Sequence, residues 1–263
     1  MNPGDSFFKD GAAYERLMGR WSQLAGEAFL DWIAVPNGLR WLDIGCGTGV
    51  FTEELIKHGS PASVVALDPS AEQVAFARNR PGATMAEFQV GDAQALSLAD
   101  NAFDIAAMAL VIHFLTDPAK ALAEAARVVR PGGWVVSYVW DYSIGGSPTA
   151  PVVAALRSLG FESSGPPSAK ATSLSALQDL WRSAGLSDIE THVIPIAVEF
   201  AGFDEFWHAM TAPVGPAGKA IAAMAADTRE RLRAILKERL SLPANGGRVT
   251  YQACANAIKG RKY

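Results

Sequence analysis

The sequence is poor in the residues that build disulfide frameworks or metal clusters, since it contains only two cysteines, Cys46 and Cys254. Two isolated cysteines do not make the spacing of a zinc site, so we expect neither a disulfide nor a metal. No run of about 18 apolar residues is present, which argues against a membrane-spanning helix. The first ten residues lack the basic-then-apolar order of a signal peptide. We therefore expect a cytoplasmic protein.

An excess of positive charge is also missing. The 23 Lys and Arg residues against 27 Asp and Glu residues give a formal net charge of −4. Such a balance does not supply the broad basic surface that nucleic acids need, so we expect no nucleic-acid partner. Apolar residues, by contrast, make up 49% of the 263 residues, which is enough for a substantial core in one large domain.

The most informative segment is a glycine-rich turn between a predicted strand and a predicted helix. An apolar run containing Asp43 leads into glycines at alternate positions, Gly45, Gly47 and Gly49. A strand, a turn without side chains and a helix start is how α/β proteins bring the backbone close to a nucleotide-like ligand. The dinucleotide fingerprint G-x-G-x-x-G would need glycine at position 50, where this chain has Val50. Val50 and Asp43 together favour a ligand that carries a positive charge over a pyrophosphate.

Strand and helix patterns alternate about four times after this turn begins. Ser70 and Gln73 form a capping box that opens a helix to about Arg80, and the Pro-Gly-Gly at 131–133 is expected to stop a later helix. Apolar runs predict strands at residues 39–44, 63–67, 84–90, 103–110, 134–140, 188–200 and 248–259. The pattern predicts an α/β fold: a Rossmann-like, doubly wound, mostly parallel seven-stranded sheet with helices on both faces.

Five motifs carry a resemblance to a known family, and they lie at residues 42–49, 68–70, 91–93, 103–104 and 127–133. In this order and spacing they resemble the class I S-adenosylmethionine-dependent methyltransferases, especially the group of the ubiquinone/menaquinone-biosynthesis C-methyltransferases. The resemblance covers about residues 38–140 strongly and the rest loosely. It implies transfer of the S-adenosyl-L-methionine methyl to a small-molecule acceptor by in-line attack on the sulfonium, with S-adenosyl-L-homocysteine as product.

The resemblance also implies a cofactor site at the glycine turn and at the strand ends. Asp43 is expected to face the positively charged methionine end of the cofactor, and Asp68 to accept hydrogen bonds from both ribose hydroxyls. Cys46 is expected to pack beside the turn and not to act as a nucleophile. The other cofactor-binding residues of these two motifs are expected to be Gly45, Cys46, Gly47, Thr48, Gly49, Pro69 and Ser70.

The adenine and the amino group of the cofactor are assigned to the next two strand ends. Asp92 is expected to accept a hydrogen bond from the adenine amino group, while the Ala93 amide addresses a ring nitrogen. The end of the fourth strand, at Met108 and Ala109, typically offers a backbone carbonyl to the cofactor's amino group.

The organisation implied by the resemblance is a single methyltransferase domain over residues 1–263. Residues 1–37 form a helical N-terminal lid, 38–140 the cofactor-binding core, and 141–263 an acceptor-side half with a helical insert at about 203–240 before the last strand. In the lid, Tyr14 is placed over the cofactor and Arg20 beside its carboxylate. The alternative for this segment is a helix packed on the sheet with its charges in solvent.

The sequence names no catalytic base firmly. His113 follows the fourth strand on the ligand side of the predicted sheet, and the ordinary pKa of histidine suits proton removal, so it is the candidate catalytic residue. The alternative is a structural histidine within an apolar run. Asp141 and Tyr142, after the fifth strand, are candidates for lining the acceptor pocket, and His208 is a weaker one.

Two other classes of protein stay open at this point. A chain that binds S-adenosylmethionine and transfers nothing is not excluded, because no base is assigned. An NAD(P)-dependent oxidoreductase is less favoured, because of Val50 and Asp43. Within the methyltransferase hypothesis, aromatic residues in the insert suit an apolar or aromatic acceptor, although such residues are more often part of a core. The motifs of amino-methylating and cytosine-methylating nucleic-acid enzymes are missing from the sequence.

Overall fold

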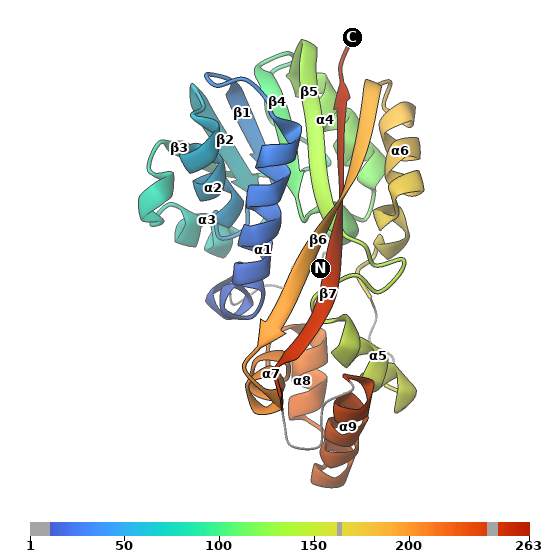
Figure 1. The fold of residues 1–263 in the computed structure, drawn as a ribbon. Coiled ribbons are helices and arrows are strands. Elements are labelled where there is room, and N and C mark those ends of the chain that lie inside the picture. The colour runs from blue at the N-terminus through green and yellow to red at the C-terminus, as the bar shows by residue number, and fades with distance from the viewer. Residues whose placement is uncertain (1–10, 162–164, 241–246) are drawn as a thin grey trace.

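The computed structural model describes residues 11–161, 165–240 and 247–263, and a seven-stranded sheet lies at its centre (Figure 1). Strands β1 to β5 are parallel, and β7 is antiparallel to both of its neighbours, β5 and β6. The order across the sheet is β3-β2-β1-β4-β5-β7-β6, so the winding reverses between β1 and β4. The bounds are β1 Arg40–Ile44, β2 Ser63–Asp68, β3 Ala86–Val90, β4 Phe103–Ala109, β5 Val129–Trp140, β6 Ser187–Phe200 and β7 Val249–Arg261. The expected Rossmann-like α/β fold is confirmed.

Helices cover both faces of the sheet because alternate side chains of each strand point to opposite faces. In β1, Trp41 belongs to the core under α1 and α2, whereas Leu42 belongs to the core under α4 and α6. The helices in the described part of the chain are α1 Gly11–Ile33, α2 Val50–Gly59, α3 Ala71–Ala77, α4 Pro118–Val128, α5 Ala150–Ser158, α6 Leu174–Ser183, α7 Phe203–Met210, α8 Gly215–Ala222 and α9 Ala226–Arg239.

Helix α3 is shorter than the sequence predicts, since it ends at Ala77 and not near Arg80. The Ser70 cap is confirmed, because its side chain accepts a hydrogen bond from the Gln73 amide. Pro81 explains the early end: a residue before proline is disfavoured in helical conformation, and Arg80 is extended with ψ 119°. The chain therefore turns at Arg80 into the short helix η2 (Pro81–Ala83).

The prediction that Pro131-Gly132-Gly133 stops a helix was wrong. Helix α4 ends at Val128, and the three residues lie inside β5. They make an irregular stretch of the strand, where the pairing of β5 with β4 shifts register between Phe103 and Ile105. The backbone of Lys262 pairs with Gly132 and Gly133 there. The motif therefore ties the start of β5 to the residue that follows β7, instead of capping a helix.

Strands β6 and β7 continue past the carboxyl ends of the parallel strands to the helices α7, α8 and α9 (Figure 1). Helix α5, which follows β5, packs against α8 and α9. These helices thus lie at the same end of the molecule as the carboxyl ends of β1 to β5. Among the described residues, no helix has both the length and the apolar character needed to cross a membrane.

Candidate functional site

The glycine turn follows β1 and folds as a left-handed loop. Gly45, Gly47 and Gly49 have φ of 78°, 54° and 82°, a region that side chains disfavour. A Cβ on Gly45 would lie 2.5 Å from the Val111 side chain, so this position has no room. Among the described residues, a Cβ on Gly47 would meet nothing within 4 Å, so this part of the chain leaves the Gly47 backbone open on one side. Gly47 is therefore where a ligand can approach the main chain.

Asp68 joins the end of β2 to this turn. One carboxylate oxygen accepts a hydrogen bond from the Gly47 amide at 3.0 Å, and the other accepts one from the Ser70 amide at 2.9 Å. Burial raises the pKa of Asp68, and the two amides oppose that effect. Because an ionised carboxylate has about four acceptor positions, Asp68 keeps capacity for hydroxyl donors of a ligand. Pro69 is exposed beside it.

Asp43 is the most unusual acid of the site because it is completely buried. Its Oδ2 accepts a hydrogen bond from the Thr52 hydroxyl at 2.6 Å, and its Oδ1 has no partner among the described residues. Burial raises the pKa of Asp43 to about 7, with a smaller contribution from the charge of Asp68. A buried carboxylate with a free oxygen is costly unless a cation or a donor reaches it. A positively charged ligand group at this place would meet that need.

The ends of β3 and β4 complete the same edge of the sheet. Asp92 is exposed just after β3, and its Oδ1 accepts a hydrogen bond from the Gln94 amide at 2.9 Å. Ala93 is buried next to it. At the end of β4, the Met108 carbonyl accepts a hydrogen bond from the Ser137 hydroxyl at 2.6 Å, so one of its lone pairs is engaged. Ala109 is half-buried and ends the strand.

His113 lies in the short helix η3 (Ile112–Phe114) and is buried. Its Nδ1 has no hydrogen-bond partner in the described structure, and burial lowers the pKa of the imidazole to about 3. The side chain is therefore neutral across the physiological range, and a group of such low pKa is a weak proton acceptor. The lowered pKa of His113 therefore argues against a general base at this position, whereas its Nδ1 can take part in a hydrogen bond with a ligand. The His113 ring lies 5.0 Å from that of Tyr142.

Asp141 and His208, two candidates for the acceptor pocket, each make hydrogen bonds in a different part of the structure. Asp141 is buried at the end of β5, where its carboxylate accepts hydrogen bonds from the Ser143 hydroxyl and from Asn256 at 2.7 Å. It is therefore held by its own neighbours and shapes the loop that carries Tyr142. His208 lies on α7, where its ring nitrogen is 2.6 Å from the Asp204 carbonyl.

The cofactor roles of the two lid residues, Tyr14 and Arg20, stay predictions. The side chain of Tyr14 lies outside the described residues, so its role stays a prediction. Arg20 donates a hydrogen bond to the Glu199 carbonyl, and its guanidinium lies 5.0 Å from the ring centroid of Phe200. Arg20 thus contacts the end of β6 and not the glycine turn. Cys46 is buried, and burial raises the pKa of its thiol, as expected of a packing residue.

Sequence reasoning missed Arg80, which contacts three elements around the turn. Its guanidinium donates to the Thr48 carbonyl at 2.9 Å, to Glu53 at 2.7 Å and to Glu15 at 2.7 Å. No sequence signal distinguishes Arg80 from other surface arginines, because its partners come from distant segments of the chain.

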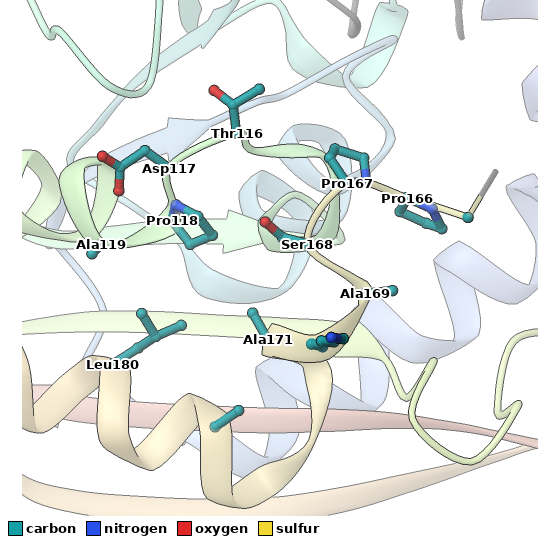
Figure 2. Close-up of a pocket in the computed structure, with 13 residues that line it drawn as sticks. Thr116, Asp117, Pro118, Ala119, Pro166, Pro167, Ser168, Ala169, Ala171 and Leu180 are labelled. Atoms are coloured by element: carbon teal, nitrogen blue, oxygen red, sulfur yellow. The ribbon is translucent and has the colours of Figure 1, made fainter.

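A cavity of about 640 Å³ lies on the α4 and α6 side of the sheet (Figure 2). It is bounded by the start of α4, by residues 165–171 and by Leu180. The Ser168 amide donates a hydrogen bond to the His113 carbonyl, so the cavity adjoins the short helix η3, which follows β4. Its lining contains none of the predicted cofactor-binding residues.

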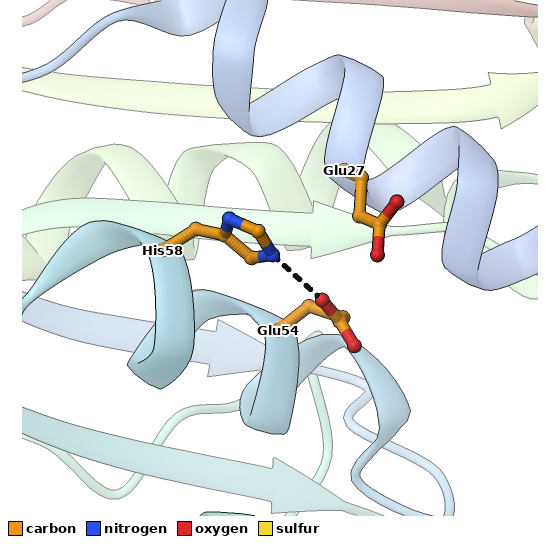
Figure 3. Close-up of side chains that lie close together, drawn as sticks. All are labelled: Glu27, Glu54 and His58. Carbon is orange, nitrogen blue, oxygen red and sulfur yellow. Dashed lines mark hydrogen bonds and ion pairs between the residues drawn. The ribbon is translucent and has the colours of Figure 1, made fainter.

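A second polar cluster joins α1 to α2 away from the turn (Figure 3). It contains Glu27, Glu54 and His58, whose polar atoms lie within 4.8 Å of one another. The Gln23 amide donates to both carboxylates, and a ring nitrogen of His58 lies 3.0 Å from the carboxylate of Glu54. The buried Glu54 carboxylate is therefore paired, and these contacts link α1 to α2.

The fold and the strand-end acids together define a class: a Rossmann-like α/β protein with a site for a nucleoside ligand that carries positive charge. Residues 42–137 match the family described as a methyltransferase domain. The chain is 38% identical over 111 residues to the ubiquinone/menaquinone biosynthesis C-methyltransferase of Roseobacter denitrificans. The aligned segment covers 41% of this chain and 44% of that relative. It is 35% identical over 128 residues to the malonyl-[acyl-carrier protein] O-methyltransferase of Pectobacterium atrosepticum, covering 49% of each.

A solved structure shares the fold over nearly the whole chain. It is an S-adenosylmethionine-dependent methyltransferase from Thermotoga maritima, described as a possible histamine N-methyltransferase. The TM-score is 0.59 and the sequence identity 21%, and the match covers 97% of this chain and 96% of that one. The match covers less than half of each of the two relatives above. These comparisons show that residues 42–137 resemble a methyltransferase domain and that the chain shares its fold with a solved S-adenosylmethionine-dependent methyltransferase.

Proposed function

We propose that this chain transfers the methyl group of S-adenosylmethionine to a small-molecule acceptor, by in-line attack on the sulfonium methyl. The observation that carries the proposal is the buried Asp43, whose Oδ1 has no partner among the described residues and lies at the strand end that leads into the glycine turn. A dinucleotide would bring pyrophosphate charge to this place, whereas S-adenosylmethionine brings an ammonium and a sulfonium.

The binding roles follow from where each residue lies. Asp43 faces the cationic methionine end, the open backbone at Gly47 lies against the cofactor, and Asp68 accepts from the ribose hydroxyls. Asp92 and the Ala93 amide receive the adenine. The remaining contacts are proposed for Gly45, Cys46, Thr48, Gly49, Pro69, Ser70, Met108 and Ala109.

The cofactor supplies an electrophilic methyl when bound, so the chain's task is to align the acceptor with it. His113 is proposed to accept a hydrogen bond from the acceptor, as a neutral imidazole, through its Nδ1, which has no partner among the described residues. This arrangement suits an acceptor that reacts without prior loss of its proton. Residues 141–263, with α7 to α9 between β6 and β7, form the acceptor side, and α1 forms the lid of a single domain.

The acceptor is proposed to be a small molecule of apolar or aromatic character. The aromatic residues Phe203, Phe206 and Trp207 of α7 are buried in the core beside β6, so they do not themselves support this character. The two named relatives methylate carbon and oxygen respectively, and the acceptor of this chain is proposed only as a class.

The alternative is a chain that binds the cofactor without methyl transfer. A solved neighbour with a TM-score of 0.53 and 20% identity is a [4+2]-cyclase, so the fold by itself carries other chemistry. An NAD(P)-dependent oxidoreductase is not favoured by the comparisons.

Two measurements test the proposal. Calorimetric titration of the whole chain with S-adenosylhomocysteine and with NADH should show binding of the first and not of the second. Incubation with methyl-labelled S-adenosylmethionine and a panel of small metabolites should then transfer label to a soluble product. Binding of NADH alone would refute the cofactor assignment, and binding of S-adenosylhomocysteine without any labelled product would favour the cofactor-binding alternative.

A further inference from the structure

Arg80 connects three parts of the molecule that surround the proposed cofactor site. The guanidinium reaches the glycine turn at Thr48, the first turn of α2 at Glu53, and α1 at Glu15. Its side chain is 13% exposed, whereas the two glutamates are each about one-third exposed. A guanidinium donates in a fixed planar fork, so three partners at these places hold it in one orientation.

The contact with Thr48 acts on the glycine turn itself. The peptide group between Thr48 and Gly49 is held at both ends, because the Gly49 amide donates to the Cys46 carbonyl at 2.8 Å and Arg80 donates to the Thr48 carbonyl at 2.9 Å. A loop that is ordered before binding loses less entropy when the ligand arrives. The Arg80 side chain therefore contributes to the ordered state of the turn.

The contact with Glu53 orients the guanidinium. The Glu53 carboxylate also accepts a hydrogen bond from the Gly82 amide at 3.1 Å, and its own amide donates to the Gly49 carbonyl at 3.0 Å. Arg80, η2 and the start of α2 thus form one hydrogen-bonded unit. A lysine cannot reproduce it, since an ammonium lacks the planar fork.

The contact with Glu15 extends this unit to the first turns of α1. We propose that Arg80 is a positioning residue that couples α1 to the glycine turn. A change that loosens the packing of the first turns of α1 therefore also lowers the affinity for the cofactor. This inference rests on the proposed function for the identity of the cofactor. Glu15 and Arg80 would act on cofactor binding through the hydrogen bond to the Thr48 carbonyl, without contacting the reacting methyl group.

The test is a double-mutant cycle with Glu15→Gln and Arg80→Met, using S-adenosylhomocysteine as the probe. Titration calorimetry gives the dissociation constant of each variant, and amide hydrogen exchange of residues 11–22 in the ligand-free chain reports the hold on α1. The matched control is Arg40→Met, which removes an arginine paired with Asp104 at the start of β1. Thermal melting shows how much stability each variant loses.

We expect Glu15→Gln to weaken binding several-fold and Arg80→Met by about tenfold, with faster exchange in α1 for both. The double variant should match Arg80→Met, because the two residues act through one contact. Arg40→Met should lower the melting temperature and leave the dissociation constant unchanged.

Three results would overturn the inference. One is an unchanged dissociation constant in both Glu15→Gln and Arg80→Met, and another is additive effects in the double variant. The third is an equal loss of affinity in Arg40→Met. Should Arg80→Met fail to fold, Glu15→Gln alone decides, because its site is partly exposed. Failure of the unaltered chain to bind S-adenosylhomocysteine would overturn the proposed function as well, and is thus distinct from an unchanged affinity in the variants.

Discussion

The Asp68 carboxylate accepts a hydrogen bond from the Gly47 amide at 3.0 Å. The end of β2 and the glycine turn after β1 are therefore one structural unit, although 21 residues separate the two positions in the sequence. The Asp68 carboxylate therefore shapes the glycine turn and keeps lone pairs that can accept hydrogen bonds from a ligand.

Replacing Asp68 tests both roles. Asp68→Ala should weaken S-adenosylhomocysteine binding by about 1.5–3 kcal/mol, the range for hydrogen bonds to a charged group. Calorimetric titration measures it. Asp68→Asn, which keeps the shape and one acceptor oxygen, should lose less. A change well below tenfold in Asp68→Ala would contradict the assignment of Asp68 to the cofactor.

The raised pKa of Asp43 predicts that binding depends on pH. Burial raises this pKa to about 7, and a cationic ligand at Oδ1 favours the ionised form, so binding near neutral pH should release a proton. Affinity for S-adenosylhomocysteine should therefore fall as the pH drops from 8 to about 6. Titration in buffers of different ionisation enthalpy measures the released proton. Asp43→Asn should remove the pH dependence, and its persistence in that variant would assign the proton to another group.

The same pKa predicts a trend in the stability of the ligand-free chain. Asp43 ionises near pH 4 when unfolded and near pH 7 when folded, so the folded state binds more protons between these values. The contribution of Asp43 to stability is thus full below about pH 4 and decreases as the pH rises to 7. Denaturant melts at several pH values should show that Asp43→Asn gains stability over the unaltered chain as the pH rises. A constant difference across this range would argue against the raised pKa.

Asp104 is expected to matter for stability and not for the cofactor. It lies near the start of β4, at the amino ends of the parallel strands, whereas the glycine turn lies at their carboxyl ends. Its carboxylate accepts hydrogen bonds from Arg40 and Arg130, which hold the pKa of the carboxyl well below its usual range. Asp104→Asn should lower the free energy of unfolding by about 1–3 kcal/mol. The loss should shrink as the pH falls below about 4. Binding of S-adenosylhomocysteine should be unchanged, and a weaker affinity would show that this motif acts on the site.

Two glycines of the turn should differ in what they tolerate. Gly45→Ala places a Cβ 2.5 Å from Val111 and should lower the melting temperature strongly. The Cβ of Gly47→Ala meets no atom of the described residues within 4 Å, so the left-handed φ is the expected cost in stability, about 1–2 kcal/mol. Its Cβ should nonetheless occupy the ligand side and weaken S-adenosylhomocysteine binding more than its loss of stability implies. Equal affinity in Gly47→Ala and the unaltered chain would show that the cofactor does not approach there.

Much of the fold could be predicted from local patterns. Strand β1 and the Ser70 cap follow from an apolar run and from a capping residue, whose effect acts within a few residues. The end of α3 and the Pro-Gly-Gly stretch were mispredicted, because Pro81 stops α3 before Arg80, and because Gly132 and Gly133 pair with Lys262, far along the chain. The contact of Arg20 with the Glu199 carbonyl, 179 residues away, was not predicted, and the role of Arg20 at the cofactor stays a prediction.

The sequence by itself determined the strand–helix alternation, the three-glycine turn and the acids that end β1, β2 and β3. These features are short-range, since each depends on residue type and on neighbours within one turn or one strand. Only the tertiary structure decided that Asp43 is buried with an oxygen that has no partner among the described residues, that burial lowers the pKa of His113, and that Arg80 meets Glu15 across 65 residues. Burial and long-range pairing arise from how the elements pack, and no local pattern encodes which distant side chains a given packing brings together.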